Sequence, residues 1–165
     1  MISDDYKAQN KTLHDNPAYG TSGQIYVKIV RDLARHLNTY DILDYGCGKR
    51  TLEQALGHPI KNYDPCIEGL DTVPEPADLV VCTDVLEHIE PDFLDAVLDD
   101  LDRVTRRMAF FQIANRPAKK ILPDGRNAHL IQEPMSWWLR KIAPRFNIMQ
   151  AEEKGSSIYF VLERK

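Results

Sequence analysis

The chain has 165 residues, of which 43% are hydrophobic and 28% charged, and this balance predicts one globular domain with one core. The 21 basic and 25 acidic side chains leave a net charge of −4, which argues against a protein that grips long nucleic acid through a basic surface. Three scattered cysteines, a polar start at Met1–Asp5 and the lack of an apolar run of about 20 residues predict a cytoplasmic protein without disulfides or membrane spans.

The first part of the chain is polar and irregular. Residues 1–22 lead into the run Tyr19–Gly23, with glycines at 20 and 23, which predicts either a lid over a ligand site or a partly mobile segment. Apolar residues at helical spacing then predict an amphipathic helix, with one face formed by Tyr26, Ile29, Val30, Leu33, Ala34 and Leu37.

From residue 41 onward, short apolar strands alternate with helices. Strands are predicted at 41–45, 60–64, 77–83 and 108–114, and helices at 51–56, from about 91 to 104, and at 135–142. The last two strands, 146–150 and 157–162, are close enough to pair as an antiparallel hairpin. This order predicts an α/β fold over residues 1–165, with an open, mostly parallel sheet flanked by helices and a ligand site beyond the carboxyl ends of its strands.

The strongest functional signal is the run Leu43-Asp44-Tyr45-Gly46-Cys47-Gly48-Lys49. Two glycines directly after a strand let the backbone pass close to a ligand, and the helix that follows presents free N–H groups. The second strand ends at Asp64, which either accepts both hydroxyls of a ribose or starts an Asp-Pro turn. The third strand ends in the polar run 82–88. Three strands therefore deliver glycines, an acid and a polar cluster to the same edge.

Over residues 42–112 the chain resembles the class I S-adenosylmethionine (SAM)-dependent methyltransferases, and most of all their small-molecule O-methyltransferase-like members. The resemblance implies a single-domain, abridged Rossmann-like sheet and SAM as the cofactor. It places the glycine loop against the methionine part of SAM and Asp64 at the ribose hydroxyls, while Leu86-Glu87-His88 looks like a recurring Leu-Glu-His of the family. The implied cofactor-binding residues are Asp44, Gly46, Cys47, Gly48, Asp64, Pro65, Cys82, Thr83 and Asp84.

The chain departs from the family pattern in two places. Arg50 stands where the family often has a third glycine. Residues 65–76 are too few for the usual helix, strand and helix, so we expect an abridged sheet and an adenine pocket partly rebuilt from this connector, with Ile67 or Leu70 as candidates.

The resemblance implies a methyltransferase that acts on an oxygen or nitrogen atom of a small-molecule or nucleotide-like acceptor. A hydroxyl nucleophile must be positioned and deprotonated, and Asp84, His88 and His129 are the candidates, although each could instead be structural. The small size leaves open a non-catalytic SAM-binding partner subunit. An NAD-binding oxidoreductase is a weaker alternative, because Thr51 stands where the dinucleotide fingerprint has glycine or alanine.

A divalent metal is a further hypothesis for the same residues. Asp84, Glu87, His88 and the distant His129 together offer two carboxylates and two imidazoles. The set is similar to the Glu-x-x-Glu-His plus distant His of small-RNA 2′-O-methyltransferases, which implies a Mg-type ion. The predicted partners are the acceptor and a second copy of the chain, since Trp137 and Trp138 cannot share one helix face and one of them could line a subunit contact or a substrate cleft.

Overall fold

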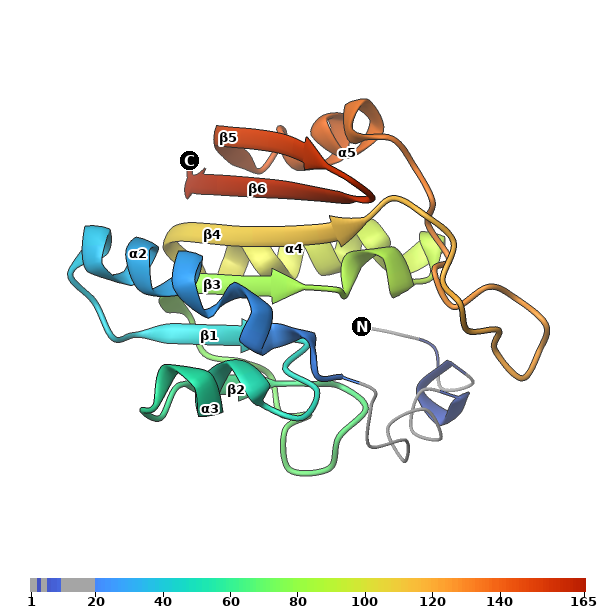
Figure 1. Cartoon of the computed structure of the whole chain (residues 1–165), viewed down its shortest axis with the longest axis horizontal. Coiled ribbons are helices and arrows are strands. Elements are labelled where there is room, and N and C mark those ends of the chain that lie inside the picture. Colours follow the sequence, from blue (N-terminus) through green and yellow to red (C-terminus); the bar gives the residue numbers. More distant parts are fainter. Residues whose placement is uncertain (1–2, 4–5, 10–19) are drawn as a thin grey trace.

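A six-stranded mixed sheet organises the computed structural model, which describes residues 3, 6–9 and 20–165 (Figure 1). The strands are β1 (Ile42–Tyr45), β2 (Lys61–Tyr63), β3 (Ala77–Thr83), β4 (Thr105–Ala114), β5 (Phe146–Lys154) and β6 (Ser157–Arg164). Their order is β2-β1-β3-β4-β6-β5, with β2, β1, β3 and β4 parallel and β6 antiparallel to both of its neighbours. The predicted parallel sheet with an antiparallel edge hairpin is confirmed.

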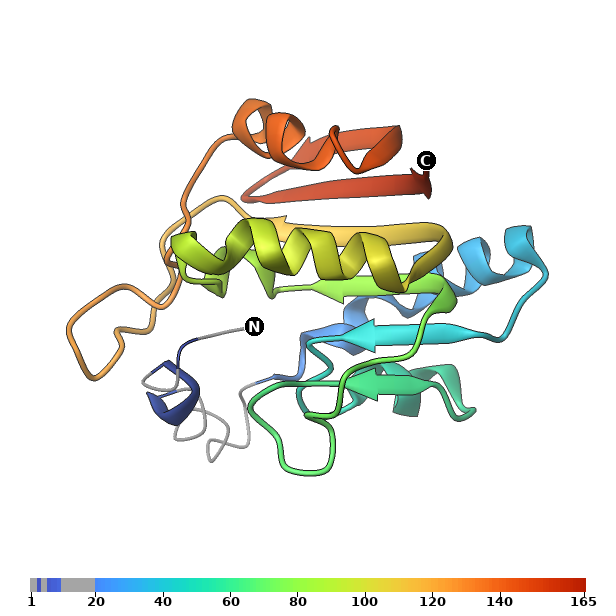
Figure 2. The same ribbon diagram turned by 180° about the vertical axis from the view of Figure 1, so that it is seen from behind.

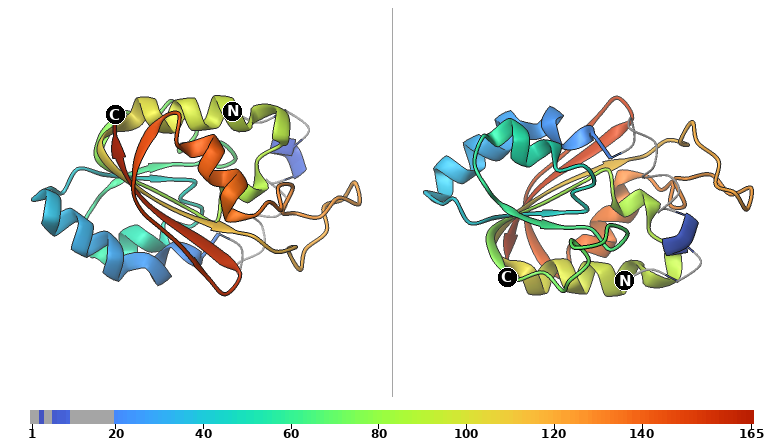
Figure 3. Two further views of the ribbon diagram at one scale, coloured as in Figure 1. Left: turned by 90° about the horizontal axis from the view of Figure 1, so that it is seen from above. Right: turned by 90° about the horizontal axis from the view of Figure 1, so that it is seen from below.

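Helices cover the two faces of the sheet. The helices α2 (Val27–Leu37) and α3 (Thr51–Leu56) lie on one face, and α4 (Leu94–Val104) and α5 (Met135–Ile142) lie on the other (Figure 3). Along β3, Leu79 and Val81 pack toward α2, whereas Val80 packs toward α4. This alternation explains the continuous apolar run of a strand buried on both faces. None of the described helices has the length and apolar character needed to cross a membrane.

Some element boundaries differ from those predicted. The strand β4 begins at Thr105, directly after α4, because the Thr105 hydroxyl donates to the Leu101 carbonyl oxygen (2.7 Å) and so ends the helix without a loop. Both strands of the closing hairpin are longer than predicted, since their pairing runs from Phe146↔Arg164 to Lys154↔Ser157. The connector 65–76 contains no helix or strand, as expected.

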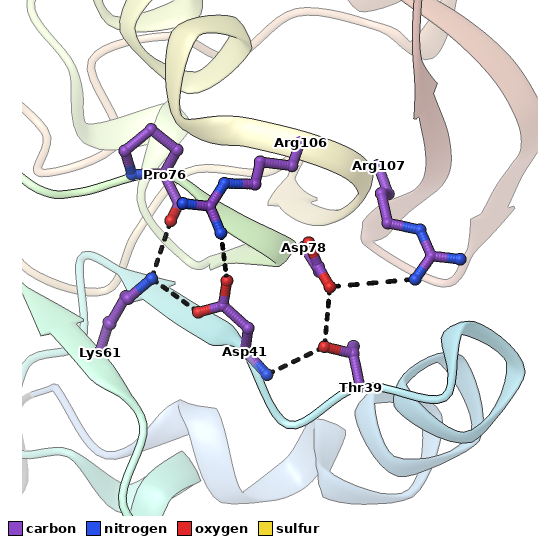
Figure 4. Close-up of polar contacts among 7 residues, drawn as sticks. All are labelled: Thr39, Asp41, Lys61, Pro76, Asp78, Arg106 and Arg107. Atoms are coloured by element: carbon purple, nitrogen blue, oxygen red, sulfur yellow. Dashed lines mark hydrogen bonds and ion pairs between the residues drawn. The ribbon is translucent and has the colours of Figure 1, made fainter.

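Ion pairs close the amino-terminal edge of the sheet, opposite the glycine loop (Figure 4). The Asp41 carboxylate accepts from Lys61 Nζ (2.6 Å) and from Arg106 Nη1 (2.7 Å). Beside it, the Thr39 hydroxyl donates to Asp78 (2.9 Å). These contacts tie together the segments that enter β1, β2, β3 and β4, so this edge is a fixed base for the opposite one.

We expect Asp41→Ala to lower the free energy of unfolding by about 1–2 kcal/mol, because it leaves two half-buried cations without their shared partner. The exposed Asp32, which pairs with Lys28 and Arg35 along α2, offers the control: Asp32→Ala should change stability by less than about 0.5 kcal/mol. Urea denaturation at low and high salt measures both. Equal decreases in the free energy of unfolding for the two variants would contradict a special role for the cluster of Asp41, Lys61 and Arg106, here called the Asp41 cluster.

Candidate functional site

A cleft opens at the carboxyl edge of the sheet, where β1, β2 and β3 end. Its empty space, open solvent included, amounts to about 750 Å³. Eight of the nine predicted cofactor-binding residues line it: Asp44, Gly46, Cys47, Gly48, Asp64, Pro65, Thr83 and Asp84. Cys82 is a correction to the prediction, because its side chain is fully buried in the core on the α4 face, where the pleat of β3 directs it.

The glycine loop passes very close to its neighbours. Gly46 (φ 82°) and Gly48 (φ 49°) are both in the left-handed region. A Cβ on Gly46 would overlap Val85 Cγ2, and one on Gly48 would lie 2.7 Å from the Gly20 carbonyl oxygen. Arg50 keeps the left-handed backbone (φ 56°) at the position where the family often has a third glycine, which costs about 1–2 kcal/mol for a side-chain-bearing residue.

Two buried carboxylates stand beside this loop. Asp64 Oδ2 accepts from the Gly48 amide (3.1 Å), and its Oδ1 accepts from the Cys66 amide (3.0 Å). These bonds fix the position of the Asp64 carboxylate at the edge of the cleft. Burial raises the pKa of Asp44 to about 7, with smaller contributions from the charges of Asp64 and Glu53.

The connector 65–76 folds back on the end of β2. The Asp64 amide donates to the Leu70 carbonyl oxygen (2.9 Å), and the Leu70 amide donates to the Ile67 carbonyl oxygen (3.0 Å). This turn points Ile67 and Leu70 into a separate hollow behind the glycine loop, so neither candidate for the adenine side lines the cleft. Cys66 lines it instead.

The described part of the N-terminal segment lies at the carboxyl edge of the sheet, beside the long loop that follows β4 (Figure 2). Ser3 donates to Glu90 through both its amide and its hydroxyl (2.9 Å each). Tyr6 is buried against Leu122 and Ala128 and lines the cleft. The lid prediction for residues 1–22 falls in part on residues 1–2, 4–5 and 10–19, which lie outside the described residues.

Cys66 and Ile89 line the cleft and were not predicted from the sequence, whereas Tyr6, Gly20 and Gly23 belong to the segment predicted as a lid. The glycines at 20 and 23 were a usable signal, because the Lys49 amide donates to the Gly20 carbonyl oxygen (3.0 Å) and brings the two glycine runs together. The sequence placed Tyr6 only within the predicted lid, and its contact with Leu122 and Ala128, in a loop more than a hundred residues away, could not be predicted.

The predicted catalytic histidines, His88 and His129, are in contact although they are 41 positions apart in the sequence. The rings of His88 and His129 pack edge to face, with centroids 4.7 Å apart. His88 Nδ1 lies 2.7 Å from the Ala128 carbonyl oxygen, and His129 Nδ1 lies 2.6 Å from that of Arg116. A carbonyl oxygen can only accept, so both Nδ1 atoms are donors. Burial lowers the pKa of His88 to about 4, and its ring is therefore neutral near pH 7.

Two carboxylates complete this cluster. Asp84 follows β3 with a left-handed backbone (φ 61°), and Glu87 is fully buried, with Oε1 accepting from the Ala114 amide (2.6 Å). Asp84, Glu87, His88 and His129 each offer one ligand atom, and these atoms all lie within 4.8 Å of one another. Among the described residues, this is the group of side chains that could hold a metal ion.

The cleft thiols do not suit nucleophilic catalysis. Burial raises the pKa of Cys66 to about 12 and holds the pKa of Cys47 still further above its usual range. Neither residue is a thiolate at neutral pH, and the thiolate is the reactive form. The polar chemistry of the cleft therefore belongs to its carboxylates and imidazoles.

Comparison with known proteins places this architecture. No protein-family model and no curated protein matches the chain. Among solved structures, 1,6-didemethyltoxoflavin-N1-methyltransferase from Burkholderia thailandensis, with 1,6-didemethyltoxoflavin and S-adenosylhomocysteine bound, is 15% identical, with a TM-score of 0.66 over 100% of this chain and 91% of that one. Magnesium protoporphyrin IX methyltransferase from Synechocystis, with S-adenosylhomocysteine bound, is 17% identical, with a TM-score of 0.60 over 86% and 83%.

The methyltransferase domain of bacterial CtHen1-C is similar over 86% of this chain and 97% of its own length, at 16% identity and a TM-score of 0.59. The chain therefore has the Rossmann-like fold of the class I SAM-dependent methyltransferases.

Proposed function

We propose that the protein is a SAM-dependent methyltransferase that acts on an oxygen or nitrogen atom of a small-molecule or nucleotide-like acceptor. One observation carries the proposal: the glycine loop, the fixed carboxylate of Asp64 and the polar end of β3 line a single cleft. The residues fit the cofactor, since the loop leaves no room for a Cβ at Gly46 or Gly48. The methyltransferase fold supports this assignment.

The residues of the cleft divide between the parts of the cofactor. Gly46 and Gly48 would hold the methionine part, with the Asp44 carboxylate as a counter-ion for its ammonium group. Asp64 would accept the ribose hydroxyls, with Cys66 and Pro65 beside the adenine. When bound, SAM supplies an electrophilic methyl group on a sulfonium.

The acceptor would bind beyond β3, where Asp84 and His88 line the cleft and His129 supports His88. These groups can orient a nucleophilic atom of the acceptor for attack on the methyl group. Two of the similar structures have names that specify small-molecule substrates, 1,6-didemethyltoxoflavin and magnesium protoporphyrin IX, which supports a small-molecule acceptor here. A cytoplasmic location and a homo-oligomer stay predictions. Trp138 is buried in the core, so only the half-buried Trp137 remains for a subunit contact.

Calorimetric titration with SAM, S-adenosylhomocysteine and NAD tests the cofactor assignment directly. We expect the first two to bind and NAD not to bind. Methyl transfer to mixtures of hydroxyl and amine acceptors, followed by mass spectrometry, tests the activity. A protein that binds SAM tightly and transfers no methyl group in any mixture would be the partner subunit instead.

Asp64→Asn should weaken SAM binding by about 30-fold, because the amide loses charge-assisted bonds to the ribose and turns one donor toward a backbone N–H. Glu68→Gln is the matched control, since Glu68 is exposed on the same connector and does not line the cleft. Its affinity for SAM should equal that of the unmodified protein. Equal affinities for the Asp64 variant and the control would place the ribose elsewhere.

A further inference from the structure

Four polar side chains gather at one side of the cleft, three from the segment after β3 and His129 from the loop after β4. We propose that Asp84, Glu87, His88 and His129 bind one divalent transition-metal ion, which presents open coordination positions to an oxygen atom of the methyl acceptor. The binding of an acceptor oxygen to the ion rests on the proposed function, whereas the binding of the ion to these four residues does not.

Both histidines are oriented as metal ligands are. The Nδ1–H groups of His88 and His129 donate to the carbonyl oxygens of Ala128 and Arg116. Each bond fixes the ring and its tautomer, and each leaves Nε2 with a free lone pair. The ligand atoms of the two residues lie within 4.8 Å of each other, which is close enough for one ion to bridge.

Glu87 supplies the independent observation. The residue is fully buried, and its Oε1 accepts from the Ala114 amide, whereas Oε2 has no partner at hydrogen-bond geometry, although the Asp84 carboxyl group is a close neighbour of Glu87. An unpartnered carboxylate oxygen in the core is costly, and such groups are usually paired or coordinate a metal. An ion at the centre of the cluster would satisfy this oxygen.

Asp84 opens the cluster to the cleft. Its backbone is held in the left-handed region by the bond from its amide to the Gln112 carbonyl oxygen (3.1 Å). Strain of this kind persists where the surrounding structure imposes it, and it gathers at functional sites. The residue is exposed and, like His88, lines the cleft, while Glu87 and His129 close the site from behind.

The donor set favours one class of ion. Imidazole nitrogens suit Fe²⁺, Ni²⁺, Cu²⁺ and Zn²⁺, and carboxylates suit Mn²⁺, whereas Mg²⁺ prefers oxygen ligands and retains several waters. We therefore infer a transition ion in place of the Mg-type ion expected from the sequence. A six-coordinate ion with four protein ligands keeps two positions, and the open side of the cluster directs them toward the acceptor.

This arrangement selects acceptors that carry a hydroxyl oxygen. An ion lowers the pKa of a bound hydroxyl, so the acceptor can lose its proton to the medium. The oxygen–carbon bond then forms as the carbon–sulfur bond of SAM breaks, and the electron pair of that bond stays on sulfur as S-adenosylhomocysteine. An amine acceptor would benefit less from the ion, because a neutral amine attacks the methyl group without first losing a proton.

The test starts with protein freed of metal by a chelator and titrated with Mn²⁺, Co²⁺, Zn²⁺ or Mg²⁺. We expect one ion per chain by calorimetry, a visible absorption band for Co²⁺, and affinity for Mg²⁺ at least about 100-fold weaker. His129→Ala and Asp84→Asn should each weaken Co²⁺ binding at least about 10-fold. His36→Ala, on the exposed side of α2, should leave it unchanged.

Asp84→Asn keeps the test decisive if loss of a buried ligand impairs folding, since Asp84 is exposed. Binding of S-adenosylhomocysteine to the same variants separates the two proposals. Intact S-adenosylhomocysteine binding with no uptake of Mn²⁺, Co²⁺ or Zn²⁺ would overturn the metal site alone. Equal Co²⁺ affinity in the unmodified protein and both ligand variants would overturn it as well. Loss of S-adenosylhomocysteine binding in the unmodified protein would instead overturn the proposed function.

Discussion

Gly48→Ala should abolish measurable SAM binding and lower the free energy of unfolding by about 2–4 kcal/mol. Gly48 has a left-handed backbone (φ 49°), and an added Cβ would lie 2.7 Å from the Gly20 carbonyl oxygen and 2.9 Å from its Cα. Backbone atoms cannot rotate away as a side chain can, so the segment that begins at Gly20 must move off the loop. That movement opens the wall against which the methionine part of SAM would lie.

Gly125→Ala is the matched control for this prediction. Gly125 also has a positive φ (88°), but an added Cβ would have no atom within 4 Å. The Gly125→Ala variant should therefore lose only about 1 kcal/mol in free energy of unfolding, the conformational cost of a positive φ, and should retain full SAM affinity. Urea denaturation and calorimetry compare the two variants. If they behave alike, backbone strain and not close packing governs the loop.

At Gly46, unlike at Gly48, the steric overlap caused by an added Cβ can be relieved by a second substitution. The atoms that a Cβ would meet there belong to the side chain of Val85. Gly46→Ala combined with Val85→Ala should therefore recover part of the lost stability, whereas the backbone contact at Gly48 has no such remedy.

Asp44→Asn should stabilise the ligand-free protein near pH 8 and weaken its SAM binding. Burial raises the pKa of Asp44 from 3.8 to about 7, so the folded state holds one more proton than the unfolded state between these values. The contribution of this group to stability is complete below about pH 4 and is lost as the pH rises toward 7. Asparagine resembles the protonated acid and removes that loss, which amounts to at most about 4 kcal/mol.

The measurement is urea denaturation from pH 4 to pH 8. The stability difference between Asp44→Asn and the unmodified protein should grow up to about pH 7 and then level off. SAM affinity of the unmodified protein should rise between pH 6 and pH 7.5, because an ionised Asp44 can pair with the ammonium group, and the variant should lack this rise. A stability difference that stays constant across the range would mean that Asp44 is ionised in the fold throughout.

The site could be predicted at strand ends, where local pattern and sheet geometry agree. Asp44, Gly48 and Asp64 follow directly from strands whose parallel order was evident in the alternation of elements. The side chain of Cys82 was assigned to the wrong place because position near a strand end does not decide which face a residue points to. The pleat decides that, and it directs Cys82 toward α4.

Loop residues could not be placed in the same way. Ile67 and Leu70 were chosen as apolar residues near the adenine side, but hydrogen bonds within the connector turn them away from the cleft. His129 reaches His88 only because the loop after β4 is folded by its own contacts. The Asn127 side chain bonds both the amide and the carbonyl of Ala118 (2.9 Å each). The conformations of such loops depend on many weak contacts that the periodicity of the sequence does not encode.

The direct passage from α4 into β4 at Thr105 has a consequence for engineering the protein. It leaves the junction between α4 and β4 without a loop in which a library of variants could be built. The long loop after β4 is the opposite case, with Pro123, Asp124, Gly125 and Arg126 exposed at its tip. Directed evolution of acceptor range should therefore randomise residues 123–126 and leave His129 and its anchors untouched.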